Sequence, residues 1–253
     1  MSAPRTVPWA AGIVLGVLLL GWLAGGEGRI DLEARFLGPG LAHPMGTDEL
    51  GRDLLDRFWL GGARSVTLGL GMTAFHVALG LLLALLSHRR GPARWALLGL
   101  ADLLASIPAT LLALLLLAFL RPGLPSLLLA LALGGWIPYA RMALTQLDAL
   151  RQDPSLAQER LMGAGAIHRL FRHTLPRLWP VLGAQASVGL GAVILVEGGL
   201  SFLGVGLPPD RASWGTMLAS ARAFFLVSPW PLVWPSLGLL AVLLCLRRDG
   251  ADA

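Results

Sequence analysis

The sequence contains no lysine, because all 20 of its positively charged residues are arginine. A chain without lysine cannot contain a phosphate-binding loop of the G-x-x-x-x-G-K-[ST] type, so any hydrolysis of ATP by a P-loop would need another chain. Charged residues make up only 14% of the 253 residues, against about 25% in an ordinary soluble domain. The composition therefore excludes an ordinary soluble domain.

Cysteine and grouped catalytic side chains are also scarce. The single cysteine, Cys245, lies inside an apolar run and cannot form a disulfide within the chain. The five histidines are dispersed, without the i, i+4 spacing of a zinc-protease helix. Ser187 and Ser201 lie in apolar runs and have no paired histidine base near them in the sequence. The sequence thus predicts no catalytic residues and no cofactor bound by this chain.

Long apolar runs dominate what is present, and several reach the roughly 20 residues that a helix needs to cross a bilayer. We expect an all-α, polytopic membrane protein with six transmembrane helices, at about 8–25, 64–87, 95–119, 124–146, 178–202 and 230–247. The first run follows Arg5 as in a signal peptide. It is long for one, however, and no clear A-x-A cleavage site follows, so we expect an uncleaved helix.

The distribution of arginine predicts the orientation. With a cytoplasmic N-terminus, 12 arginines fall in segments on the inside and 8 in segments on the outside, and the short loop 88–94 alone holds three. Positive residues favour the cytoplasmic side of membrane helices. Both termini and the 147–177 loop are then expected in the cytoplasm, and 26–63 and 203–229 on the outer side.

The 147–177 loop is polar, basic and compatible with helix. Asp153 and Pro154 are typical of a helix start, Gly163 and Gly165 allow a turn, and 167–174 can form a second short helix. On these residues alone, the loop is either a docking surface for a soluble partner or an amphipathic helix that lies on the membrane.

Two stretches of this loop carry a family resemblance: Ala157-Gln-Glu-Arg-Leu-Met-Gly-Ala-Gly165 and Phe171-Arg-His-Thr-Leu-Pro176. They resemble the EAA loop of ABC-importer permeases, above all the dipeptide, oligopeptide and nickel permease family, whose pattern is E-A-A-R-A-L-G-A-S and then I/L-x-x-H-x-L-P. Ala157 replaces the first Glu, and Glu159 the second Ala. The resemblance implies an ATPase-coupling loop with the residues Asp153, Ala157, Gln158, Glu159, Arg160, Leu161, Met162, Gly163, Ala164 and His173.

A second block, 43–57, is similar to the HPLGTDELGRDVLSR signature of the same family. Its signature residues are His43, Gly46, Thr47, Asp48, Gly51, Arg52 and Asp53. The glycines suit turns, Thr47 and Asp48 suit caps, and the Asp/Arg pairs can lock a compact polar cover. A metal site of His43, Asp48 and Asp53 is the alternative, although the spacing does not require it. Two further blocks, 134–141 and 196–217, resemble the family's GWxxYAR and TEAALSFLGLG…SWGxML.

Two acidic residues, Asp102 and Glu197, lie within the expected spans. Charged groups inside a membrane usually face the interior of a bundle or a cavity. One interpretation places Asp102, Glu197 and Ser201 along a transport pathway or at its gate. The other makes the acidic groups structural, held by hydrogen bonds or by arginine. The sequence favours neither interpretation.

The resemblance implies an ABC type I importer permease (MetI-like) fold. Residues 1–42 would form the N-terminal transmembrane helix and the start of a periplasmic segment, and 43–253 the permease domain. The expected partners are a second homologous permease subunit, two cytoplasmic ATPase subunits that hold ATP and Mg, and a periplasmic or lipid-anchored binding protein, with no nucleic acid. The chain would lie in a bacterial inner membrane and import di- or oligopeptides, or alternatively nickel or a metallophore chelate. A stand-alone alternative is an ion-coupled secondary carrier or an intramembrane enzyme; a carrier should show inverted repeats.

Overall fold

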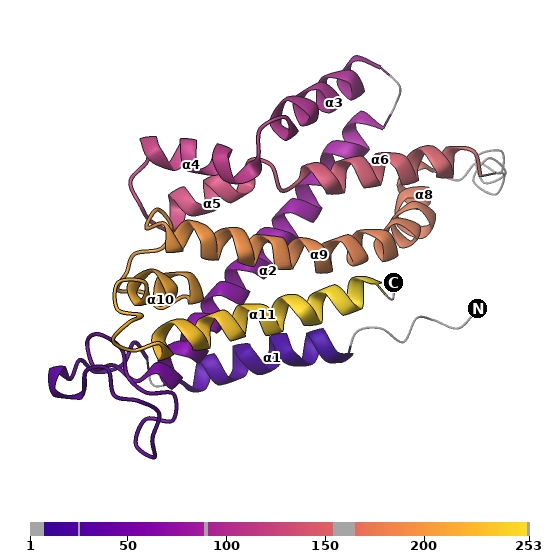
Figure 1. Cartoon of the computed structure of the whole chain (residues 1–253). Helices are drawn as coiled ribbons and strands as arrows, with labels where there is room; N and C mark the ends of the chain where they lie inside the picture. Colours follow the sequence, from indigo (N-terminus) through magenta and orange to yellow (C-terminus); the bar gives the residue numbers. More distant parts are fainter. Residues whose placement is uncertain (1–7, 25, 89–90, 154–164, 252–253) are drawn as a thin grey trace.

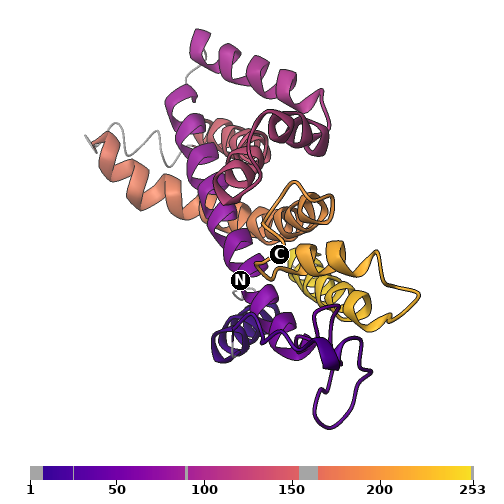
Figure 2. The same cartoon turned by 90° about the vertical axis from the view of Figure 1, so that its left-hand side faces the viewer.

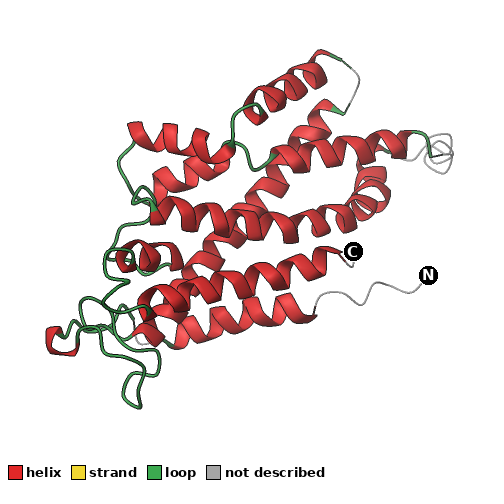
Figure 3. Ribbon diagram, viewed as in Figure 1, coloured by secondary structure: helices red, strands yellow, loops and turns green. Residues whose placement is uncertain are grey.

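The structure is a computed structural model that describes residues 8–24, 26–88, 91–153 and 165–251. These residues are mostly helical (Figures 1 and 3). The elements in chain order are α1 (Pro8–Leu23), the 3-10 turn η1 (Leu32–Ala34), α2 (Leu54–Ser87), α3 (Pro92–Ala105), α4 (Ala109–Phe119), α5 (Leu124–Ala132), α6 (Ile137–Arg151), α8 (Ala166–Arg169), the π-helical turn η2 (Leu170–Thr174), α9 (Leu175–Phe202), α10 (Trp214–Ala221) and α11 (Trp230–Ala251).

Among the described residues, three helices are long and apolar enough to cross a membrane. They are Leu54–Ser87, Leu124–Arg151 and Ile167–Phe202, with 34, 28 and 36 residues. The helices α3 and α4 meet the same criteria only as a pair, which is bent by 83°. Ala11–Leu23 and Trp230–Leu246 are apolar but shorter. The helical, membrane-spanning character expected from the sequence is confirmed, whereas six separate full-length spans are not.

The helices α2 and α9 organise the interior. Three clusters of buried apolar residues lie along the molecule, and both helices contribute to each of them. The first cluster joins them to α3 and α6, the second to α1, α10 and α11, and the third to α4 and α5. In Figure 1, α2 accordingly crosses the bundle diagonally behind the other helices.

Small residues let α2 approach its neighbours closely. A Cβ atom at Gly80 would lie 2.7 Å from the Cβ of Tyr139 and 2.8 Å from the carbonyl oxygen of Trp136. A Cβ at Gly69 would lie 2.7 Å from Cγ1 of Ile194 on α9. Both distances are shorter than real Cβ contacts, so these positions need glycine. Close approach through small residues is a common way for membrane helices to associate.

The two ends of the bundle differ. The start of α1 and the ends of α2, α6 and α11 lie at one end, on the right in Figure 1, together with α8. The segment 26–53 and α10 lie at the other end, on the left. Seen from that left-hand end in Figure 2, α1, α9 and α11 are viewed nearly along their axes, and α3 lies at the edge of the molecule.

Three boundaries differ from the expected ones. The helix α2 begins at Leu54 rather than near 64, because the Asp53 carboxylate accepts hydrogen bonds from the amides of Leu55 and Asp56 at 2.7 and 3.3 Å and caps the helix there. The expected span 95–119 is broken before Pro108, as the fixed proline ring predicts. Residues 167–174 do not form a separate helix, because they continue directly into α9.

Candidate functional site

The segment 43–57 forms a compact polar cover at the left-hand end of the bundle. Asp48 is its centre: Oδ1 accepts hydrogen bonds from the amides of Leu50 and Arg52, both at 2.9 Å. Oδ2 lies 2.7 Å from Nε of Arg52 and 3.4 Å from Nε of Arg57. Gly46 and Gly51 have φ angles of +84° and +73°, which glycine adopts without strain. The predicted turns and Asp/Arg pairs are therefore present.

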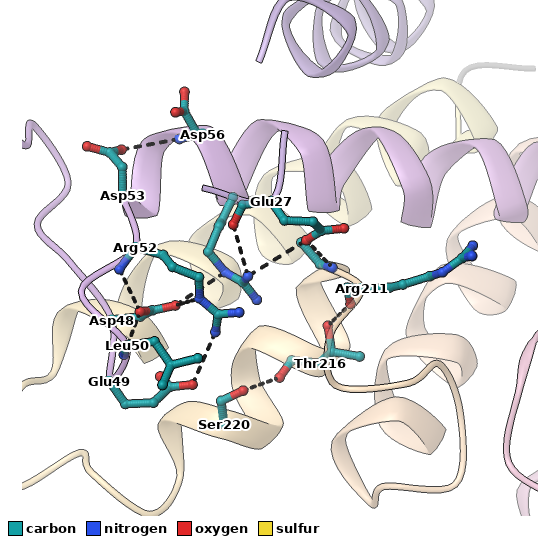
Figure 4. A network of polar contacts seen from close by, with 12 residues as sticks. Glu27, Asp48, Glu49, Leu50, Arg52, Asp53, Asp56, Arg211, Thr216 and Ser220 are labelled. Atoms are coloured by element: carbon teal, nitrogen blue, oxygen red, sulfur yellow. Dashed lines mark hydrogen bonds and ion pairs between the residues drawn. The ribbon is translucent and has the colours of Figure 1, made fainter. Parts of the chain in front are cut away.

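Arg57 ties this cover to the helices. Its side chain is only 2% exposed and lies between two carboxylates, with Nε 3.4 Å from Oδ2 of Asp48 and Nη1 3.7 Å from Oε2 of Glu27. Figure 4 shows the Asp48 and Glu27 carboxylates. Glu27 also pairs with Arg64 and accepts a hydrogen bond from the amide of Ala212 at 3.0 Å. One glutamate thus joins the end of α1, the start of α2 and the approach to α10. Loss of one partner from a buried ion pair typically costs about 3–5 kcal/mol.

The residues offered as an alternative metal site are engaged in other ways. Nδ1 of His43 lies 2.7 Å from Oδ2 of Asp53, while Asp48 faces Arg52 and Arg57. Within the described ranges, no three His, Cys, Asp or Glu side chains group as metal ligands would. The structure thus places Asp48 against two arginines, while His43 and Asp53 form a separate pair.

Glu197 lies in a fully buried hydroxyl cluster. Its Oε1 accepts hydrogen bonds from Ser201 at 2.9 Å and from Ser213 at 3.1 Å, and its Oε2 accepts one from Ser65 at 3.0 Å. These serines belong to α9, to the N-cap of α10 and to α2. Buried polar groups need such partners. The cluster joins three elements around one carboxylate.

Asp102 is held differently, by an ion pair with Arg141 of α6. The two side chains are 68% and 46% exposed. A second ion pair joins the same helices: Nη1 and Nη2 of Arg94 lie 2.9 and 2.6 Å from the two carboxylate oxygens of Asp148. This bidentate geometry is the strong form of the arginine–carboxylate interaction. The expected structural partners of Asp102 and Glu197 are thus arginine and serine respectively.

Most of the predicted coupling loop lies outside the described residues, namely Ala157, Gln158, Glu159, Arg160, Leu161, Met162, Gly163 and Ala164. Its flanks are described. Asp153, just after α6, forms an ion pair with Arg177 at the start of α9. His173 lies in η2, with its ring centroid 6.0 Å from that of His168. The two helices that the loop joins are therefore tied together at its base.

Comparison with known proteins identifies the family. Residues 76–247 match the family described as "Binding-protein-dependent transport system inner membrane component". The chain belongs to this family. The match covers the end of α2, all elements from α3 to α10 and most of α11, and includes Asp102, Arg141 and Glu197.

Three relatives that match most of this chain are permease proteins of transport systems. A probable D,D-dipeptide transport system permease protein of Escherichia coli K12 is 36% identical over 244 residues, which are 94% of this chain and 82% of the relative. A di/tripeptide transport system permease protein of Pseudomonas aeruginosa is 34% identical over 233 residues, 90% of this chain and 72% of the relative. The nickel transport system permease protein of E. coli K12 is 32% identical over 232 residues, 90% and 83% of the two chains.

A solved structure supports the fold. A chain of the MetNI methionine ABC transporter, in an inward-facing conformation, matches with a TM-score of 0.61 at 18% identity, over 76% of this chain and 92% of that chain. The MetI-like permease fold expected from the sequence is therefore confirmed. At this level of identity, the match speaks for the fold alone.

Sequence reasoning missed the pairing of Arg57 with Glu27, which ties the polar cover to the helices, and it missed Arg141 as the partner of Asp102. It also assigned no role to Ser65 and Ser213. One signal was available: Glu27 is the first acidic residue after the first apolar run. Its partners are 30 to 185 positions away in the sequence, so no local pattern names them.

Proposed function

We propose that this chain is the permease subunit of an ATP-driven, binding-protein-dependent importer, in which it forms half of the translocation pathway. The observation that carries the proposal is that the polar cover and the helices flanking the EAA-type segment lie at opposite ends of one helical bundle. The polar cover lies at the end where 26–53 and α10 meet, and the helices that flank the EAA-type segment, α6 and α8, reach the other end (Figure 1). Such an arrangement suits delivery of substrate at one face and mechanical drive at the other.

The proposed topology has six spans: α1, α2, the bent α3–α4 pair, α5–α6, α8–α9 and α11. Both termini and the EAA-type segment would then be cytoplasmic in a bacterial inner membrane. The excess of arginine on that side supports this orientation. It also agrees with the bundle, in which the start of α1 and the end of α11 share an end with α8.

The proposed mechanism is alternating access. Two ATPase subunits, which would hold ATP and Mg, dock on 153–173 of this chain and on its counterpart in a second, homologous permease. Their closure moves the loops, and the Asp153–Arg177 and Arg94–Asp148 ion pairs pass that movement to α9 and α3. ATP binding favours one of two states by differential stabilisation. This chain itself would hydrolyse nothing, since the absence of lysine excludes a P-loop.

The proposed substrates are di- and oligopeptides, delivered by a periplasmic or lipid-anchored binding protein to the face near 26–63 and 203–229. The names of two of the three relatives reported above support this class. Nickel or a metallophore chelate is the second candidate, favoured by the nickel permease relative. In that case the metal would cross as cargo.

The test is purification from the native host in mild detergent, followed by transport in proteoliposomes. We expect two ATPase chains and a second permease to copurify, and labelled dipeptide to enter only with ATP and a binding protein. Uptake of nickel but not of peptide would select the second candidate. Isolation of this chain alone, with ion-driven transport that needs no ATP, would replace the proposal by a secondary carrier.

A further inference from the structure

The Asp102–Arg141 ion pair lies at membrane depth. Arg141 belongs to the span Leu124–Arg151, whose 28 residues would be about 42 Å long as a helix, against a hydrocarbon thickness of about 30 Å. The middle of this span lies between Ile137 and Pro138, so Arg141 is only about 5 Å beyond it along the axis. Asp102, its partner, must lie at a similar depth. Both charges therefore sit at a level where the surroundings of a membrane protein are hydrocarbon.

Both side chains nevertheless lie on the surface of this chain, because Asp102 is 68% exposed and Arg141 is 46% exposed. Charged groups at this depth avoid lipid and face a bundle interior or a water-filled cavity. The exposed side of α3 and α6 around this pair is therefore not a lipid-facing surface in the working transporter.

An independent feature points to the same conclusion. The helix breaks between Ala105 and Ala109, one turn beyond Asp102, and the chain turns by 83° there. Every residue from 105 to 111 is exposed. Broken helices leave backbone groups without helical partners, and at membrane depth these are tolerated only inside protein or beside water. An exposed ion pair and an exposed helix break thus occur together on one face.

We propose that this face lines the aqueous pathway, and that Asp102 and Arg141 contact the charged ends of a passing free peptide. The proposal rests on the proposed function. A free peptide carries an ammonium and a carboxylate, which are complementary to Asp102 and Arg141. The guanidinium group binds a carboxylate through two parallel hydrogen bonds, and the aspartate accepts from the ammonium.

Partner exchange makes this contact suited to transport. When the peptide arrives, the internal ion pair opens and each member takes one peptide charge, so no charge is left unpaired at any stage. One ion pair is replaced by two, and closure of the internal pair releases the peptide again. A conduction pathway needs binding that is favourable enough for entry and weak enough for exit.

The first test asks whether the face is wet. In a Cys245→Ser background, we would place cysteine at Ser106 and at Thr145, which lie one turn from Asp102 and Arg141 and are both exposed. The control is Leu82→Cys on α2, an exposed apolar position near the level at which Gly80 contacts α6. The complete transporter in proteoliposomes would be treated with a charged, membrane-impermeant thiol reagent.

We expect both test positions to react at least about tenfold faster than Leu82→Cys, since only a wet surface admits a charged reagent at this depth. Slow reaction at both positions, equal to the control, would mean that lipid or the partner permease covers the face, and would overturn the pathway assignment. This result does not depend on which substrate is carried, so it is separate from the fate of the proposed function.

The second test asks whether the peptide ends are contacted. Wild type should take up a free dipeptide better than its N-acetylated, C-amidated form, with both offered at saturation of the binding protein. In the D102N/R141Q variant, the ratio of free to blocked dipeptide uptake should fall at least about fivefold, because both charge contacts are gone. The charge-exchanged variant D102R/R141D keeps an ion pair and serves as the folding control. An unchanged preference in D102N/R141Q, or no peptide uptake by wild type, would overturn the substrate contact.

Discussion

Ser213 and Glu197 join the start of α10 to the last turns of α9. The hydroxyl of Ser213 donates to Oε1 of Glu197 at 3.1 Å, and Oγ of Ser213 itself accepts a hydrogen bond from the amide of Thr216 at 3.1 Å as the helix cap. A cap on an outer helix is thereby bonded to a carboxylate buried among membrane helices. Any movement of α10 away from α9 must break this hydrogen bond. The pair is therefore a natural place for a gate and for structural support alike.

Replacement of Glu197 by glutamine distinguishes these roles. The amide oxygen of glutamine can still accept from the surrounding serines, and their hydroxyls can turn to accept from its NH₂ group. We expect the transporter to assemble normally and to transport more slowly. The measurement is the amount of complex on size-exclusion chromatography together with ATP-driven uptake. Failure of the variant to assemble would make Glu197 structural rather than part of a gate.

Ser213→Ala is the companion variant, because it removes both the cap and one hydroxyl donor to Glu197. We expect a loss of about 0.5–2 kcal/mol in the free energy of unfolding, the usual range for a lost N-cap. A lower thermal unfolding midpoint in detergent would reveal it. Ser220→Ala, which removes only a bond to the carbonyl of Thr216 within α10, is the matched control and should change little.

Arg57→Gln tests the polar cover. The substitution removes one of the two arginines that pair with Asp48, and it removes an arginine that pairs with Glu27. The Arg57 side chain is only 2% exposed, so the loss occurs in a buried place. We expect a loss of about 3–5 kcal/mol, seen as a strongly reduced yield and unfolding midpoint. Arg29→Gln removes an exposed arginine from the neighbouring segment 26–53 and should stay within about 0.5 kcal/mol of wild type. Equal behaviour of the two variants would contradict a stabilising role for Arg57.

Gly80→Ala tests the close contact of α2 with α6. The added methyl group would meet Tyr139 and the Trp136 carbonyl at 2.7 and 2.8 Å, so we expect destabilisation by about 1–3 kcal/mol. The control is Gly71→Ala on the same helix, where nothing lies within 4 Å of the new atom. Alanine favours helix over glycine, so the control should be neutral or slightly stabilising. The unfolding midpoints of the two variants should therefore move apart.

Gly163→Trp tests the proposed coupling loop. If this turn enters a cleft of the ATPase, a bulky side chain prevents its docking, and ATP hydrolysis should then no longer drive transport. The ratio of peptide imported to ATP hydrolysed is the quantity to measure. Gly12→Trp, at an exposed position on α1 with open space around it, should leave that ratio unchanged. Wild-type transport in Gly163→Trp would show that the turn is not the docking point.

The broad outline of this protein followed from local sequence. Apolar runs of the right length predict membrane helices, because the cost of leaving backbone groups without hydrogen bonds in lipid permits little else. The Asp and Arg residues of 48–57 pair as expected, since partners within one turn or loop are constrained by the chain itself. The continuous span expected over 95–119 was wrong, because Pro108 acts on its own backbone and interrupts the helix there.

Tertiary structure decided which distant charges meet. Glu27 lies beside Arg57 and Ala212, Asp102 beside Arg141, and Glu197 beside Ser65 and Ser213 only because α2 and α9 bring their neighbours together. These contacts depend on the helix crossings, and the crossings depend on how side chains pack at positions such as Gly69 and Gly80. Packing is a property of all the helices at once, whereas hydropathy and turn chemistry belong to short stretches. The sequence by itself therefore determined that the chain enters the membrane, and the fold determined which of its charges face one another there.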